Sequence, residues 1–303
     1  MGSCFATHIG AWMQGLKLPS LINPFGILYN PVSIGNNMQR MLDPYPYELQ
    51  DLEQQSGLWH SFDHHGVFSH PDPAMAVQGM NGALQEAAGF ARHTNRLILT
   101  PGSAYIYTFK KTGQVVANCH KFPASAFEKR RLGVGEVVAA LATPIEQWKS
   151  VCPDLEIILS VSPVRHIRDG LVENQGSKAT LVLALEEICR QFPFAHYFPA
   201  YELLLDDLRD YRFYESDMVH PNEQAIRYIR EYFSNSFFSE ATLALNQRIV
   251  KIINAANHRP LHPETPEHHR FRQQQLSAIA ELEKEFSFLD FSDERAFFES
   301  FKG

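Results

Sequence analysis

Three residues, one at the start of the chain and two late in it, have types and spacings suited to acyl-transfer chemistry. Ser3 stands between a glycine and a cysteine in "MGSCFATHIG", and Asp217 and His220 lie three residues apart in "ESDMVHPNE". On one turn of chain, the carboxylate can accept a hydrogen bond from one ring nitrogen of the histidine. The other nitrogen is then left to take a proton from a hydroxyl. The pair alone fits a simple helix cap equally well, because Pro221 suits the first turn of a following helix.

Alternating strands and helices are predicted to position these residues. Apolar runs predict strands within 96–100 and 155–163, and helical spacing predicts helices over 134–151 and 176–192, the latter with Ser177 as its N-cap. "AYIYTF" and "QVVANC" around "KKTG" predict a hairpin, and "HPNEQAIRYIREYF" predicts an amphipathic helix. Strands that alternate with helices favour a parallel sheet covered on both faces. In such sheets, sites form beyond the carboxyl ends of the strands.

The composition is that of an ordinary globular protein of 303 residues, 45% of them hydrophobic. A formal net charge of −7, with no run of Lys and Arg, argues against nucleic acid as a partner. No apolar run approaches the length of a spanning helix, and no signal peptide is recognisable, so no membrane association and a cytoplasmic location are expected. The cysteines show neither zinc-site nor disulfide spacing, which favours reduced thiols; they are Cys4, Cys119, Cys152 and Cys189.

Four long motifs carry a resemblance to a known family. "GSCFATHIG", "NPFGILYNP", "VANCHKFP" and "YFPAYELLLDDLRDYRFYESDMVHPN" together resemble the GSCFA family, which is related to the SGNH/GDSL hydrolases, over nearly the whole chain. The resemblance implies a three-layer α/β/α fold with a flavodoxin-like parallel sheet and an ester-hydrolase activity. It makes Ser3 the nucleophile, His220 the general base and Asp217 the residue that orients the base. It implies no cofactor and no metal.

The oxyanion hole is less well defined by the resemblance. Related hydrolases use the N–H of the nucleophile, a glycine N–H and an asparagine side chain. Gly26 and Asn118 are the candidates for the latter two, although Gly26 equally fits a plain turn. The usual G-x-N-D block is missing, so Gly102 or Ser103 in "TPGSAYIY" is an alternative donor. His120 either contacts the substrate or fills a pocket.

Two further sets of side chains invite competing interpretations. A thiolate at Cys4 is an alternative nucleophile, but a cysteine is also commonly a small buried apolar residue. The segment "WHSFDHHGVFSH" is rich in histidine. Its histidines fit a metal site, the wall of a substrate cleft, or an ordinary loop, which Gly66 and the aromatic residues favour; they are His60, His64, His65 and His70.

The start of the chain departs from the pattern of the related hydrolases. Their nucleophile follows the first strand, which lies inside the sheet, whereas only two residues precede Ser3 here. The sequence therefore lacks the residues expected for this first strand. Three explanations are open: an upstream start, which we favour, another segment in the strand's place, or an inactive chain. We expect a hydrolase domain over 1–253 and a helical C-terminal appendage over 254–303.

The leading functional interpretation is a serine hydrolase that cleaves an acetyl or other short acyl ester of a small molecule or carbohydrate. The same triad could pass the acyl group to an alcohol, which would make the protein an O-acyltransferase. A binding protein that keeps the fold but has no catalytic activity is the alternative from a different class.

Overall fold

The computed structural model describes residues 1–258 and 260–300 of the chain. The chain forms two compact units. The first unit contains Met1–Ile9 and Leu21–Arg230, and the second contains Gly10–Ser20 and the residues from Glu231 onward. No helix in the described ranges combines the length and the apolar character needed to cross a membrane.

A parallel sheet lies at the centre of the first unit. Its strands are β3 (Arg96–Leu99), β7 (Glu156–Leu159) and β8 (Ala195–Tyr197), in the order β3-β7-β8. All pairings are parallel, with Ile157 opposite Leu97 on one side and Ala195 on the other. The short apolar runs that predict strands therefore form these strands, and the expected parallel sheet is confirmed.

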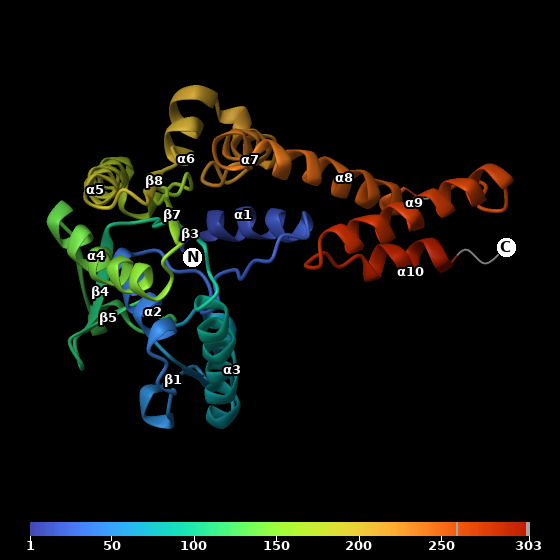
Figure 1. The fold of residues 1–303 in the computed structure, drawn as a ribbon. Helices are drawn as coiled ribbons and strands as arrows, with labels where there is room; N and C mark the ends of the chain where they lie inside the picture. The colour runs from blue at the N-terminus through green and yellow to red at the C-terminus, as the bar shows by residue number, and fades with distance from the viewer. Residues whose placement is uncertain (259, 301–303) are drawn as a thin grey trace. The chain divides into compact units, whose positions relative to one another are not determined.

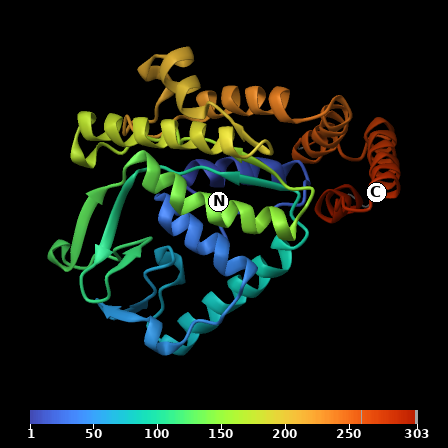
Figure 2. The same ribbon diagram turned by 60° about the vertical axis from the view of Figure 1, so that its left-hand side comes forward.

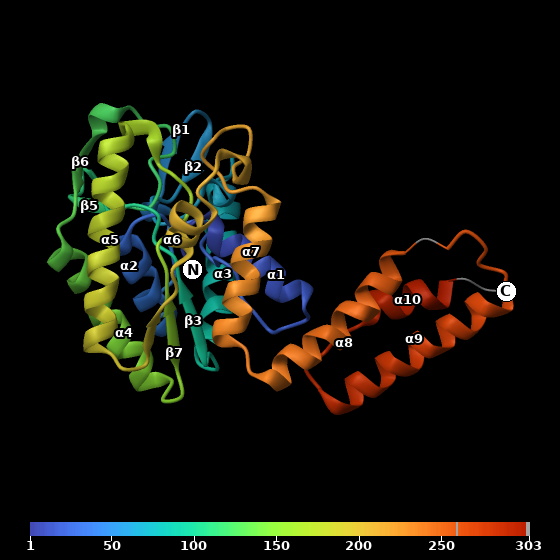
Figure 3. The ribbon, with the colours of Figure 1, turned by 90° about the horizontal axis from the view of Figure 1, so that it is seen from above.

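Helices cover both faces of this sheet. Their bounds are α1 Cys4–Gly15, α2 Pro31–Leu42, α3 Pro73–Ala91, α4 Val134–Val151, α5 Leu171–Gln191, α6 Ala200–Glu202 and α7 Glu223–Phe237. Helices α2, α4 and α5 lie on one side of the strands, and α1 and the start of α7 lie on the other (Figures 1 and 3). The predicted three-layer α/β/α architecture is confirmed.

Shorter strands build two small antiparallel sheets in the same unit. Strands β4 (Tyr105–Phe109), β5 (Gln114–Val116) and β6 (Phe127–Arg131) form a sheet in the order β5-β4-β6, which Figure 2 shows in green at the left. The predicted hairpin around "KKTG" is the β4–β5 pair. Strands β1 (Glu53–Gln55) and β2 (Leu58–His60) form a second hairpin next to the His-rich segment.

The apolar periodicity of α4 shows how the core of this unit is specified. Val137, Leu141, Ile145 and Trp148 recur at helical spacing and are all buried in one cluster with the sheet. The indole N–H of Trp148 is also satisfied, because it donates a hydrogen bond of 3.0 Å to the carbonyl of Met38 on α2. Helix α4 therefore has one preferred rotation against its neighbours.

Two local predictions about helix starts are wrong. Ser177 does not cap α5, which begins six residues earlier; its hydroxyl instead accepts a hydrogen bond of 2.8 Å from the N–H of Ala104 inside the core. Pro221 does not lie in the first turn of α7, which begins at Glu223. It pairs instead with Tyr214 in an isolated bridge. The side chain of Asn222 then accepts the N–H of Ala225 at 3.1 Å and caps the helix. Tertiary partners override the local signal in both cases.

The second unit is helical and has its own core. It contains α8 (Glu240–Asn257), α9 (Pro266–Glu285) and α10 (Ser292–Ser300). The helix expected from Gln273 to Phe286 corresponds to most of α9. The domain boundary that the sequence predicts at residue 253 falls inside α8. These helices bury one apolar cluster; its buried members are Leu245, Ile249, Ile252, Ile279, Leu282, Leu289, Phe291 and Phe298.

Candidate active site

The first residues of the chain pair in parallel with Thr100, the residue that follows β3, through an isolated bridge at Gly2. Met1 accepts the N–H of Thr100 at 2.9 Å, and Ser3 donates its own N–H to the carbonyl of Thr100 at 3.0 Å. On the opposite side, Gly2 accepts the N–H of Leu28 at 2.9 Å. Residues 1–3 therefore occupy a position between Leu28 and β3. Ser3 is the last residue of this segment and lies at the carboxyl edge of the sheet, where an α/β site is expected.

Gly2 is required by this close pairing. Its φ is +138°, and a Cβ atom at this position would collide with the carbonyl of Thr100. The Gly2 N–H is held by the side chain of Asn23 at 2.8 Å, and the amide of Asn23 donates to Thr7 at 3.0 Å. The glycine of the "GS" pair therefore sets the path of the chain that delivers Ser3.

Ser3 lies immediately before α1 and accepts the N–H of Ala6 at 2.9 Å through its carbonyl. Its side chain is only 1% exposed, and its hydroxyl lies 3.3 Å from the hydroxyl of Thr100. The first turn of α1 follows directly. A helix N-terminus of this kind favours negative charge.

Asp217 and His220 form the hydrogen bond that their spacing predicts. The Nδ1 of His220 lies 2.6 Å from Oδ2 of Asp217, and the other carboxylate oxygen accepts the backbone N–H groups of Val219 at 2.8 Å and His220 at 3.0 Å. A carboxylate can only accept, so Nδ1 carries the hydrogen and Nε2 is left as the free base. The pKa of Asp217 is lowered to about 2, first by the backbone N–H of His220 and then by its ring.

Backbone contacts fix the turn that carries this pair. Glu215 donates its N–H to the carbonyl of His220 at 2.8 Å, and Tyr214 pairs with Pro221. The N–H of Arg165, in the loop after β7, donates to the carbonyl of Val219 at 3.2 Å. The turn is therefore tied to the carboxyl end of a central strand, on the same edge of the sheet as Ser3.

The structure does not join His220 to Ser3 by a hydrogen bond. The hydroxyl of Ser3 has Thr100 as its partner, and the His220 ring is about half exposed. His220 lies within electrostatic range of His8 on α1, whose pKa is lowered first by burial and then by Arg230 and His220. The structure thus contains the Asp217–His220 hydrogen bond but no hydrogen bond between His220 and the Ser3 hydroxyl.

The N–H groups of the two glycine candidates for the oxyanion hole are already engaged. Gly26 donates to the carbonyl of Asn23 at 2.7 Å, with a φ of +82° that suits a turn. Gly102 donates to the carbonyl of Tyr29 at 2.8 Å. A Cβ atom at Gly102 would lie 3.6 Å from Cβ of Ser3, so this glycine borders the nucleophile even though its N–H is occupied.

The backbone N–H of Ser103 and the side-chain oxygen of Asn118 also have hydrogen-bond partners already. The N–H of Ser103 donates to the carbonyl of Tyr29 at 3.0 Å, as Gly102 does. The Oδ1 of Asn118 accepts the N–H of His120 at 2.9 Å, which leaves the amide N–H groups of Asn118 as the donors that this side chain can offer.

His120 belongs to an aromatic cluster in the His-rich region. Its ring stacks on His60 at 4.5 Å between centroids, and its Nε2 lies 2.8 Å from the carbonyl of Ser61. Burial lowers the pKa of His120 to about 4. The ring is therefore neutral near pH 7 and well suited to packing in the cluster.

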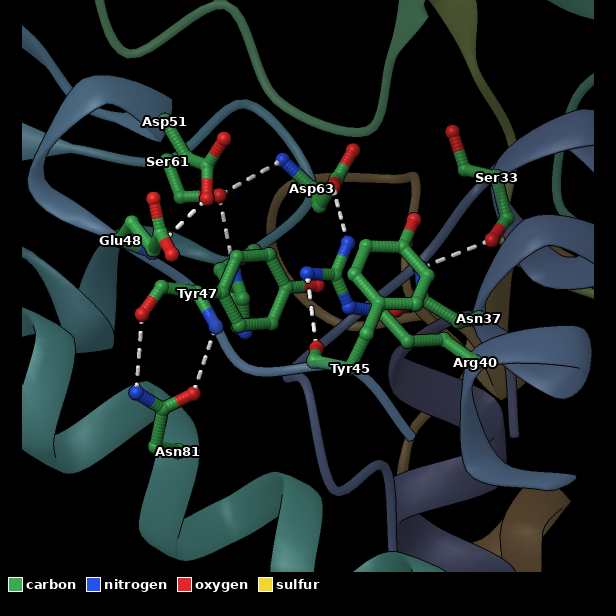
Figure 4. A network of polar contacts seen from close by, with 11 residues as sticks. Ser33, Asn37, Arg40, Tyr45, Tyr47, Glu48, Asp51, Ser61, Asp63 and Asn81 are labelled. Atoms are coloured by element: carbon green, nitrogen blue, oxygen red, sulfur yellow. Dashed lines mark hydrogen bonds and ion pairs between the residues drawn. The ribbon is translucent and has the colours of Figure 1, made fainter. Parts of the chain in front are cut away.

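Arg40 on α2 organises the neighbouring loop, as Figure 4 shows. Its guanidinium lies between two rings, 3.8 Å from the centroid of Tyr45 and 3.5 Å from that of Tyr47. It forms an ion pair of 3.6 Å with Asp63. The side chain of His64, next along the loop, is fully buried, and burial lowers its pKa to about 3. His60 and His64 are not on a helix, and no metal-binding group of three or more ligands occurs among the described residues.

Lys178 is a residue near Ser3 that the sequence reasoning missed. Its side chain is 1% exposed and donates a hydrogen bond of 2.7 Å to the carbonyl of Ser162, just beyond β7. Burial lowers its pKa to about 7, and the nearby Cys4 opposes this shift only weakly. Lys178 precedes Leu181 and Leu185 on the buried stripe of α5, a spacing that could have identified it as a buried lysine.

The thiol of Cys4 is poorly suited to nucleophilic attack. Burial raises its pKa above the ordinary value, and this outweighs the lowering by the N–H groups of Cys4 and Phe5 and by Lys178. Since the thiolate is the reactive form, Cys4 is mostly protonated near pH 7. This favours Ser3 over Cys4 as the nucleophile.

The sheet, its covering helices and polar groups at the carboxyl edge define a three-layer α/β/α protein with a site in the usual place for that class. Comparison with known proteins then gives the family. Residues 1–233 match the model of the GSCFA family, and residues 249–301 match that of the GSCFA domain protein, C-terminal domain. The chain belongs to the GSCFA family. No curated protein and no solved structure matches it.

Proposed function

We propose that the protein is a serine hydrolase that cleaves a short acyl ester of a small molecule or carbohydrate through Ser3, His220 and Asp217. The observation that carries the proposal is the 2.6 Å hydrogen bond between His220 Nδ1 and Asp217, which leaves Nε2 as a base on the same edge of the sheet as Ser3. Membership of the GSCFA family is compatible with a hydrolase.

In the proposed mechanism, Nε2 of His220 takes the proton of the Ser3 hydroxyl as Oγ attacks the ester carbonyl. Asp217, ionised at any pH above about 3 because its pKa is about 2, stabilises the imidazolium. The protonated ring then gives its proton to the leaving alcohol, and an acyl-serine remains. A water molecule, activated by the same histidine, releases the acid and regenerates Ser3.

The developing oxyanion requires donors beside Ser3. We assign this role to the side-chain amide of Asn118, and the partial positive charge at the start of α1 adds to it. Gly102 leaves space for the acyl group, because a larger residue would approach Ser3 Cβ. For attack, the Ser3 hydroxyl has to leave its partner Thr100 and turn toward His220.

Kinetics with p-nitrophenyl acetate test the triad. Ser3→Ala and His220→Ala are each expected to lower kcat/KM by about four to six orders of magnitude, because triad members act as a unit. Ser150→Ala and His93→Ala are the matched controls, since both residues are exposed and lie outside the site. The assignment fails if either triad variant keeps more than about a tenth of the activity.

A binding protein with no catalytic activity is the second candidate. The 1% exposure of Ser3 and its pairing with Thr100 favour it, since a nucleophile has to meet its substrate. In that case the wild-type protein and the Ser3→Ala variant would show the same, uncatalysed rate.

A further inference from the structure

A cavity lined by charged, aromatic and apolar residues lies beside the turn that carries His220. It has a volume of about 210 Å³ and is formed by the loop after β7 together with the segment after β8. The loop after β7 contributes Arg165. The segment after β8 contributes Arg209, which follows the helical segment Leu203–Leu208, and Tyr214, which pairs with Pro221 next to His220. The cavity therefore adjoins the proposed base.

The charges around this cavity favour an anion. Arg165 and Arg209 both line it, and neither guanidinium forms an ion pair with a carboxylate in the described part of the chain. The one acidic residue in its lining, Asp210, uses a carboxylate oxygen to accept the N–H of Arg212 at 2.8 Å. Two cations and one anion leave a net positive charge. An arginine presents a planar set of donors that suits carboxylate and phosphate groups.

Tyr214 adds an uncharged donor to the lining of the cavity. The residue is only 8% exposed, and its hydroxyl makes no hydrogen bond of normal geometry in the described ranges. The guanidinium of Arg165 lies 4.2 Å from the centroid of its ring and is held there by a bond of 3.4 Å to the carbonyl of Met218. A buried hydroxyl without a partner is costly, so a ligand acceptor at this position would satisfy it.

We propose that this cavity binds a negatively charged group of the substrate, a carboxylate or a phosphate, while the ester bond lies at Ser3. Arg165, Arg209 and the Tyr214 hydroxyl hold the anion. Leu204 and Leu205, which form the apolar part of the lining, cover the neighbouring carbon chain. The proposal deepens the proposed function and depends on it, because it specifies the class of ester as anionic.

Arg209 is the residue to change, because Arg165 also supports the catalytic turn. Isothermal titration calorimetry with the full chain measures the binding of succinate and, separately, of inorganic phosphate. Arg209→Gln is expected to weaken binding of the preferred anion about ten- to hundredfold, the loss that one charged hydrogen bond implies. Arg209→Lys should restore part of it. Arg212→Gln, three residues along and outside the cavity lining, is the matched control and should bind as the wild type does.

The two anions distinguish a carboxylate site from a phosphate site. Binding of neither anion up to about 10 mM, or equal affinity in wild type and Arg209→Gln, would overturn the proposal. Loss of binding in Arg212→Gln as well would also overturn the proposal, because it would show that anion binding depends on the total positive charge of this region and not on the cavity.

Hydrolysis separates this inference from the proposed function. The anionic ester mono-p-nitrophenyl succinate should have a lower KM than p-nitrophenyl acetate, and Arg209→Gln should raise the KM of the anionic ester alone. If both esters are cleaved equally well and Arg209→Gln changes neither, the hydrolase stands and the anion site fails. If Ser3→Ala binds succinate or phosphate normally but the wild type cleaves neither ester, the anion site stands and the hydrolase fails.

Discussion

Ser3 is the residue on which the proposed chemistry depends, and its position is set by its neighbours. Gly2 permits the close approach to Thr100, and the pairing with Thr100 holds the backbone that leads into Ser3. The burial of the hydroxyl means that its reactivity depends on small displacements of this segment. A change at Gly2 should therefore act on Ser3 even though Gly2 has no side chain.

Gly2→Ala tests this dependence at the residue scale. The added Cβ would meet the carbonyl of Thr100, and the φ of +138° is unfavourable for alanine, so we expect a loss of about 1–3 kcal/mol in stability and most of the activity. Gly15→Ala is the control, because nothing lies within 4 Å of a Cβ atom there. Thermal melts and hydrolysis of p-nitrophenyl acetate measure both effects. Equal behaviour of the two variants would mean that the segment adjusts freely.

At the scale of elements, α5 supports the site through one buried lysine. The hydrogen bond from Lys178 to Ser162 connects this helix to the end of β7. Its pKa is about 7 in the folded chain, well below the ordinary value near 10, because burial disfavours the charge. Between these two pH values, Lys178 is protonated in the unfolded chain and largely deprotonated in the folded chain. The free energy of unfolding therefore rises with pH over this range. Below pH 7, the destabilisation that comes from burying the charged Lys178 is present in full.

Lys178→Met should remove this pH dependence. In urea unfolding, the wild type is expected to gain stability relative to the variant as pH rises from about 7 to 10, with a slope of at most roughly 1.4 kcal/mol per pH unit. Lys110→Met is the control, because Lys110 also donates to a backbone carbonyl but is exposed. Parallel curves for the wild type and Lys178→Met would show that Lys178 has an ordinary pKa.

The elements also show what local sequence can and cannot predict. The strands at β3 and β7 and the helix α4 were predictable, because each is a short apolar run or a clear helical stripe. The starts of α5 and α7 were not, because Ser177 and Pro221 take tertiary partners. The Asp217–His220 bond follows from a spacing of three residues. The cavity around Arg165 and Arg209 does not, because loops after two different strands have to meet to form it.

At the scale of the whole molecule, the candidate site and the C-terminal helices belong to different units. Every residue proposed for catalysis lies in the first unit, whereas the second unit buries a separate apolar cluster. The two family matches, at residues 1–233 and 249–301, follow a similar division. Disturbing the second core should therefore lower the stability of that unit and leave the chemistry of Ser3 intact.

Two neighbouring residues on α8 provide this test. Ile249 is 0% exposed and Val250 is 38% exposed. Ile249→Ala should cost about 2–5 kcal/mol in the unfolding of the second unit, whereas Val250→Ala should change stability by no more than about 0.5 kcal/mol. Calorimetry of the full chain measures the shift. Below the unfolding transition, Ile249→Ala should hydrolyse p-nitrophenyl acetate at the wild-type rate. Loss of hydrolysis there would place part of the catalytic function in the second unit.

Covalent labelling of the full chain with a fluorophosphonate, read by peptide mass spectrometry, tests the central claim most directly. Such probes react with a serine whose hydroxyl is activated by a base. We predict a single labelled peptide with the adduct on Ser3, little or no label in His220→Ala, and none in Ser3→Ala. Absence of label on Ser3 in the folded wild-type chain, or equal labelling of wild type and His220→Ala, would contradict a Ser3–His220–Asp217 hydrolase.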